Sequence, residues 1–177
     1  MSHIVDRIDE HSATVLNRIV QREQRLHLAP TAIRRLVALL PKDSDTAIAI
    51  ARSLKLSRKQ QRAIGERLVP GPADNMPAPD AELTDIRAFA YRTNIDAARD
   101  VALLYAPDDA LPDMLARLAD WQPPVFPLTG GHLIDQGLRP GPVVAKTLAK
   151  IEAAWIAQGF PDEQWVRGFV ADLKLAG

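Results

Sequence analysis

The sequence predicts an all-α protein, a multi-helix array without a sheet. Aromatic residues make up only 5% of the 177 residues, alanine and leucine are abundant, and no run of β-branched residues alternates with polar ones. Apolar residues instead recur three and four positions apart, which is the period of a helix with one buried face. With 47% hydrophobic and 25% charged residues, the composition is that of a globular protein of one or two domains.

Four helices are expected in the first region, residues 1–70. The first helix follows Ser2 and is interrupted near His11–Ser12. Pro30 suits the first turn of the second helix, and Pro41 closes it.

Side-chain caps mark the next two helices. Asp43 or Ser44 is expected to cap the third helix, and Ser57 caps a fourth that ends near Leu68. The stretch 69–79, VPGPADNMPAP, then holds four prolines and a glycine, so it is expected to form neither a helix nor a central strand. We interpret it as the boundary of the first region.

Three connecting helices are expected in residues 80–120. Their expected ranges and start signals are 81–91 after Asp80, 95–104 after Asn94, and 109–118 after Asp108.

A helical tail is expected in residues 126–177, after the proline-rich stretch WQPPVFPL. Its expected helices are 132–136, 142–158 and 161–175. In the long helix, one stripe at i, i+4, i+7 and i+11 predicts a buried face. The stripe consists of Val144, Leu148, Ile151 and Trp155.

Several classes of protein are excluded or disfavoured. The sequence contains no cysteine, which excludes a disulfide scaffold, a cysteine nucleophile and a thiolate zinc site. No apolar run approaches the roughly 18 residues of a membrane span, and the N-terminus is polar from its start. We therefore expect a soluble, cytoplasmic protein with no membrane partner.

The charges balance overall but not along the chain. There are 22 basic and 22 acidic residues; residues 1–70 hold 13 basic and 7 acidic side chains, and residues 71–177 hold 9 and 15. Such polarity is typical either of a side that faces nucleic acid or of two ordinary solvated surfaces.

No catalytic or metal site is expected. Asp43-Ser44-Asp45 has the D-x-D spacing of a magnesium pair, but it opens a helix, where acidic and serine residues cap free amides. The four histidines lack metal-ligand spacing, and no serine lies in a G-x-S-x-G turn.

Two basic clusters are the candidate binding residues. The first surrounds the turn between the third and fourth helices and comprises Arg52, Lys55, Arg58, Lys59 and Arg62, with Arg67 at its end. Its like charges repel, and they indicate either a solvated face or an anionic partner that offsets the repulsion.

The second cluster surrounds a Pro-Gly-Pro turn that feeds the long helix. It comprises Arg139, Gly141, Lys146 and Lys150. Amides at the positive end of a helix suit a phosphate, although such turns are also ordinary tight connections in which glycine permits a positive φ.

The tail carries a recognisable pattern. Residues 126–150 resemble the end of bacterial CCA-adding tRNA nucleotidyltransferases and related poly(A) polymerases, whose tail reads like L-x-G-x-D-L, a spacer, G-x-x-P-G-P and a helix that ends in Trp-Ile. The matching residues are Leu128, Gly130, Leu133, Gly137, Pro140, Gly141, Pro142, Trp155 and Ile156. His132 departs from the pattern, because the family more often has aspartate there. Residues 35–41 and 51–57 also resemble the body of these enzymes.

The resemblance implies a helical body and tail that hold tRNA, or another RNA, largely by its backbone. A head domain with the D-x-D pair is not found in this chain, and the family would supply it in cis or in trans. The intact family enzymes transfer CMP and AMP to the tRNA 3′ end with magnesium, so no cofactor is expected in this chain. The alternatives are a helical structural or protein-interaction domain without RNA binding, and an enzyme with an unrecognised site.

Overall fold

The computed structural model describes residues 10–68 and 71–173 of the chain. These residues form helices and no strand, as predicted. The elements are α1 (Glu10–Arg25), α2 (Ala32–Leu39), α3 (Ser44–Ser53), α4 (Arg58–Gly65), the 3₁₀ helix η2 (Pro72–Asn75), α5 (Leu83–Thr93), α6 (Ile95–Tyr105), α7 (Leu111–Ala116), α8 (Gly130–Asp135), α9 (Pro142–Ala157) and α10 (Glu163–Asp172). Within this part of the chain, no helix is both long enough and apolar enough to cross a bilayer.

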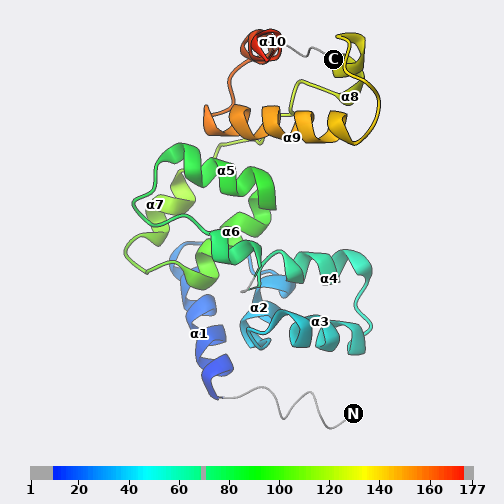
Figure 1. Ribbon diagram of the computed structural model, residues 1–177. Helices are drawn as coiled ribbons and strands as arrows, with labels where there is room; N and C mark the ends of the chain where they lie inside the picture. Colours follow the sequence, from blue (N-terminus) through cyan, green and yellow to red (C-terminus); the bar gives the residue numbers. More distant parts are fainter. Residues whose placement is uncertain (1–9, 69–70, 174–177) are drawn as a thin grey trace.

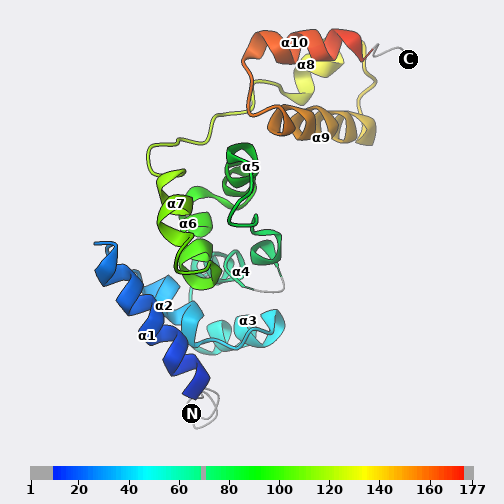
Figure 2. The ribbon, with the colours of Figure 1, turned by 90° about the vertical axis from the view of Figure 1, so that its left-hand side faces the viewer.

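The helices form two stacked units (Figure 1). Helices α1 to α7 make the larger unit, and α8 to α10 make the smaller one, in which α9 lies across α5. Residues 121–129 join the units without regular structure, and Figure 2 shows them as an extended connection. The proline-rich stretch therefore lies between the helices of the larger unit and those of the tail.

Three predicted helix starts are confirmed by their hydrogen bonds. The Asp43 carboxylate accepts a hydrogen bond from the backbone N–H of Thr46 at 2.7 Å, and the Asn94 side chain accepts one from the N–H of Ala97 at 2.8 Å. Ser57 caps α4: its hydroxyl oxygen accepts a hydrogen bond from the N–H of Gln60, and the side-chain oxygen of Gln60 accepts one from the N–H of Ser57. Each cap satisfies a helical N–H that has no partner within the helix.

The boundaries of other elements differ from the prediction. Helix α1 runs without interruption through His11–Ser12, and its predicted start at Ser2 lies outside the described residues. Pro30 precedes the N-cap of α2, which is Thr31. The stretch 69–79 contains the short helix η2, which the proline count did not predict.

The starts predicted for α5 and α7 are each wrong by two residues. Helix α5 begins after Glu82 rather than Asp80. Helix α7 begins after Ala110 because the Asp108 carboxylate is engaged elsewhere, with Arg22 at 2.9 Å and Arg25 at 3.1 Å.

The predicted first region and connecting helices share one core. Leu104 of α6 is buried with Ile19 of α1, Val37 of α2 and Ile64 of α4. The stretch 69–79 therefore divides the sequence but not the packing. The tail has a separate core around Trp155, to which α5 contributes.

A buried ionic network joins four parts of the larger unit. Asp100 of α6 accepts hydrogen bonds from Arg34 of α2 at 2.6 Å and from Arg67, just after α4, at 2.7 Å. Arg34 also donates to Glu23 of α1 at 2.7 Å, and Glu23 receives a second arginine, Arg35. Apart from Arg35, these side chains are at most 8% exposed. Buried charges require such complete pairing, because each one loses its hydration.

A second buried arginine, Arg22, supplies hydrogen-bond donors to the carbonyl groups at the C-terminal end of α6. Its guanidinium donates to the carbonyl oxygens of Leu103 and Ala106, the latter at 2.7 Å. These carbonyls lie at the negative end of the helix dipole, where a buried cation is favourable.

Replacing Asp100 by alanine is expected to lower the free energy of unfolding by about 3–5 kcal/mol, because two buried guanidinium groups lose their partner. In Glu163→Ala, which breaks a largely exposed pair with Arg167, the loss should stay below about 1 kcal/mol. Urea denaturation of both variants measures the difference. Equal, small losses would show that the network contributes no more than a surface ion pair.

Candidate nucleic-acid interface

The first basic cluster lies on the hairpin of α3 and α4. We call its five predicted side chains the basic hairpin: Arg52, Lys55, Arg58, Lys59 and Arg62. All five are exposed. The helices beneath them are fixed, because Ala47 and Ala51 of α3 and Ile64 of α4 are buried in the core.

The turn within the basic hairpin is tight and places Lys55 at its tip. Lys55 has a φ of 57°, in the left-handed region, and its N–H donates to the carbonyl of Arg52. The N–H of Leu56 reaches back to the carbonyl of Ala51 at 3.1 Å. These two hydrogen bonds are typical of a helix C-terminus that is followed by a residue in the left-handed conformation. As the predicted helix cap at Ser57 implies, Lys55 and Lys59 do not lie on one continuous helix.

The cations of this surface are not equally available. Among the described residues, Arg58 and Lys59 form no ion pair, whereas Arg62 contacts Glu66 at 3.0 Å. Because Arg62 is 84% exposed, that pair holds it only weakly. Arg67, which sequence spacing placed in the same cluster, is 7% exposed and belongs to the ionic network, so it does not contribute to the surface.

The structure adds one cation that the sequence analysis missed. Arg92 of α5 lies beside Arg52 and Arg62 around a shallow cavity of about 570 Å³, whose floor includes Gly65 and Ile48. Arg92 is 30 residues from Arg62 along the chain. No local pattern links the two, and they meet because the end of α5 lies beside the end of α4, where the Asn94 side chain donates a hydrogen bond to Glu66 at 2.7 Å.

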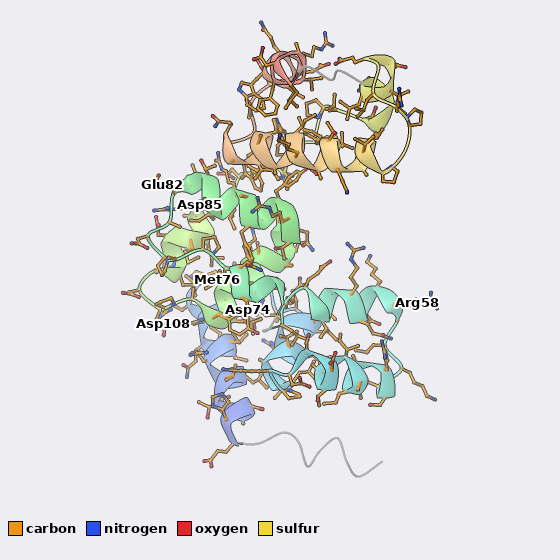
Figure 3. The ribbon with its side chains drawn as sticks, viewed as in Figure 1. Arg58, Asp74, Met76, Glu82, Asp85 and Asp108 are labelled. Atoms are coloured by element: carbon orange, nitrogen blue, oxygen red, sulfur yellow. The ribbon has the colours of Figure 1, made fainter. Side chains whose placement is uncertain are left out.

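Several carboxylates of the larger unit lie away from the basic hairpin. Figure 3 shows Arg58 at one edge and Glu82, Asp85 and Asp108 at the opposite edge. Asp108 is paired with Arg22 and Arg25. The five exposed cations of the basic hairpin attract an anionic partner to that side of the unit.

The second cluster surrounds the start of α9 in the tail. Arg139, Gly141, Lys146 and Lys150 are all exposed, and the two lysines are four residues apart on one helical face. The turn offers an anion few amides, since Pro142 has no N–H and the N–H of Val144 donates to the Gly141 carbonyl. Gly141 itself has a φ of 140°, which favours glycine.

Helix α5 is the contact between the two units. Tyr91 donates a hydrogen bond to Glu152 of α9 at 2.8 Å, and its ring meets Trp155 edge-on at 5.7 Å between centroids. Phe160 packs against both rings and against Trp121 of the connecting segment. Arg87 lies over Trp121, 5.8 Å from the ring centroid. These aromatic contacts fix how the tail sits on α5.

The remaining residues that were considered for catalysis or metal binding either stabilise the fold or do not cluster. The Asp43 carboxylate caps α3, and the hydrogen bonds from Thr46 lower its pKa. Within the described residues, no three His, Asp or Glu side chains lie close enough together to hold a metal ion. His132 closes the cap of α8 with Thr129, and His3 lies outside the described residues.

Comparison with protein-family models, with curated proteins and with solved structures finds no match to this chain. The resemblance to CCA-adding enzymes therefore rests on the motif residues of the sequence alone.

The two tyrosines of the chain test the contact between α5 and α9. Burial, the hydrogen bond to Glu152 and the charge of Glu152 raise the pKa of Tyr91 to about 12. Burial and the charge of Asp74 raise the pKa of Tyr105 to about 12. In an absorbance titration at alkaline pH, both should therefore ionise above the ordinary value of about 10.

Replacing Glu152 by glutamine should lower the pKa of Tyr91 and leave that of Tyr105 unchanged. Because the folded pKa of Tyr91 exceeds the unfolded value, its stabilising contribution is present below pH ~10 and is lost as the pH rises through about 12. A titration that Glu152→Gln leaves unaltered would contradict the contact.

Proposed function

We propose that this chain is a non-catalytic helical RNA-binding region of a CCA-adding tRNA nucleotidyltransferase or a poly(A) polymerase-like enzyme. It holds tRNA for nucleotide addition at the 3′ end by a head domain, in cis or in trans. Magnesium and the reacting nucleotides belong to that head domain. The observation that carries the proposal is the basic hairpin, five exposed cations on a rigid pair of helices.

The geometry of the basic hairpin suits a phosphate backbone. Its cations project from α3, α4 and the turn between them, and the core holds the backbone of these two short helices in place. Double-stranded RNA is recognised mostly by its shape and by phosphate and 2′-hydroxyl contacts, which require no base code.

The alternative, a protein-interaction domain, has less support. Among the described residues, the large apolar side chains classed as exposed lie on five separate segments: Leu54, Leu83, Val125, Ile134 and Val143. Five such residues provide little exposed apolar surface for a protein interface, which is expected to expose a larger patch.

Replacing Arg58 and Arg62 together by alanine should weaken the binding of different tRNAs about equally and make its salt dependence shallower, because phosphate contacts release counterions. Folding should be preserved, since both side chains are exposed. Filter binding or fluorescence anisotropy over a salt series measures both effects.

The matched control is Arg25→Ala/Arg167→Ala, which removes two exposed arginines outside the basic hairpin. It should retain most of the affinity. Absence of tRNA binding at low salt by the unmodified chain, or equal loss in both double variants, would reject the basic hairpin as the RNA surface.

A second experiment tests the proposal that this chain has no nucleotide-adding activity of its own. The isolated chain should not incorporate CMP or AMP into tRNA that lacks its 3′ end, with magnesium or manganese supplied, because Asp43 serves as a helix cap. Incorporation by a clean preparation that is lost in Asp43→Asn and Asp45→Asn would overturn this role.

A further inference from the structure

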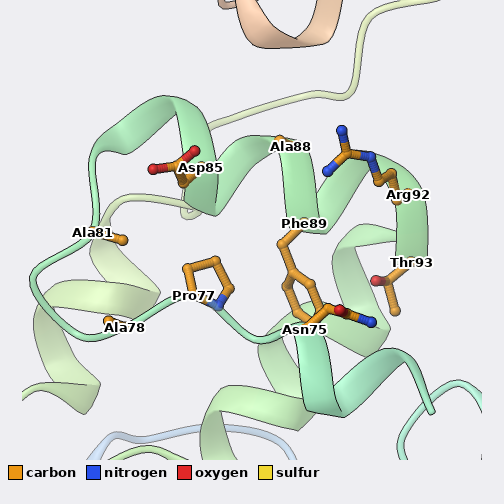
Figure 4. Close-up of a pocket in the computed structure, with 9 residues that line it drawn as sticks. All are labelled: Asn75, Pro77, Ala78, Ala81, Asp85, Ala88, Phe89, Arg92 and Thr93. Carbon is orange, nitrogen blue, oxygen red and sulfur yellow. The ribbon is translucent and has the colours of Figure 1, made fainter. Parts of the chain in front are cut away.

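A pocket of about 710 Å³ lies between α5 and the segment that follows η2 (Figure 4). Pro77 and Phe89 form its apolar centre, and Ala88 lines it on the α5 side. Asn75 lies beside the Phe89 ring. The lining of this open slot mixes apolar side chains with Asn75, Asp85, Arg92 and Thr93, so it offers both an apolar contact and hydrogen bonds to a small ligand.

The two ends of the pocket carry opposite charges. Asp85 and Arg92 are seven residues apart on α5, so their Cα atoms are separated by about 10 Å along the helix. Both side chains are exposed, and among the described residues neither takes part in an ion pair. Figure 4 shows them on opposite sides of Phe89. A ligand that spans the pocket meets a hydrogen-bond acceptor at one end and a cation at the other.

The cationic end continues into the basic hairpin. Arg92 and Thr93 line both this pocket and the cavity that contains Arg52 and Arg62. The two cavities therefore adjoin at Arg92 and Thr93, which places the slot beside a cavity lined by three arginines. A phosphodiester chain that follows the arginines passes the mouth of the slot.

We propose that the slot holds one unpaired nucleotide of the bound RNA. Its base lies against Pro77 and Ala88, and its phosphate lies between Arg92 and Arg62. The inference rests on the proposed function, because the basic hairpin supplies the path of the backbone. It adds a site for a single unstacked base to a surface that otherwise contacts phosphates. Unpaired bases in RNA are commonly held in this way, by an apolar contact and hydrogen bonds to their edges.

The polar groups predict which bases fit. The Asp85 carboxylate accepts hydrogen bonds, so it favours bases with an exocyclic amino group, and the amide of Asn75 both donates and accepts. Carboxylates pair with the amino group of cytosine, and amides pair with adenine. Uracil has no amino group and leaves Asp85 without a donor. The slot is therefore expected to prefer nucleotides whose base carries an amino group, which are those of cytosine, adenine and guanine, over uridine nucleotides.

Nuclear magnetic resonance of the full chain tests the site directly. CMP, AMP and UMP are each titrated to millimolar concentration into labelled protein, and amide shifts are followed. We expect the shifts to centre on residues 75–93, with UMP the weakest ligand. Shifts elsewhere, or none, would overturn the inference.

Two variants and a control separate the roles of the two ends. Arg92→Ala should weaken all three nucleotides and tRNA by about two- to fivefold. Asp85→Ala should reduce the preference of CMP over UMP while UMP binding is retained or improved. Arg167→Ala removes the same charge from α10 and should change neither.

The outcomes distinguish this inference from the proposed function. If tRNA binding depends on Arg58 and Arg62 but not on Arg92, and mononucleotides do not bind, the slot is rejected and the function stands. If mononucleotides bind but Arg92→Ala leaves tRNA binding unchanged, the slot takes a free nucleotide and the inference is wrong. If tRNA does not bind at all, the proposed function and the inference fail together.

Discussion

The carboxylate of Asp100 is the point on which the larger unit depends. Each of its oxygens receives one arginine, Arg34 from α2 and Arg67 from the end of α4. Because all three side chains are buried, displacement of any one leaves a charge without water and without a partner. The network thus fixes where α2 and α4 lie on α6. The position of the basic hairpin follows from it, since Arg67 anchors the end of the helix that carries Arg58 and Arg62.

The same residue type therefore serves two purposes within a few positions. Arg62 is solvent-exposed and Arg67 is buried, and the sequence around them does not distinguish them. Helix periodicity separates apolar from polar faces, but an arginine enters the core only when a carboxylate meets it there. The carboxylate in question is 33 residues away, on α6. Sequence spacing therefore predicts the basic cluster but wrongly includes Arg67 in it.

Local signals predicted the elements well and the three-dimensional sites poorly. Caps at Asp43, Ser57 and Asn94 are short-range chemistry, as is the stripe of α9, and all of them appear as predicted. Asp108 failed as a start signal because its carboxylate pairs with two arginines of α1, more than eighty residues earlier in the chain. The two cavities lined by Arg92 are formed by segments that are distant in the sequence, α4, α5 and the proline-rich stretch, so no sequence window predicts them.

Helix α5 connects the candidate surfaces of the two units. Tyr91 contacts α9 of the tail, while its neighbour Arg92 lines the groove beside the basic hairpin. Adjacent residues of a helix point about 100° apart, so one rigid element faces both surfaces at once. The aromatic contacts of Trp155 and Phe160 hold the tail on the same helix. The position of Arg92 beside the basic hairpin and the position of the tail therefore both depend on how α5 is held in the core.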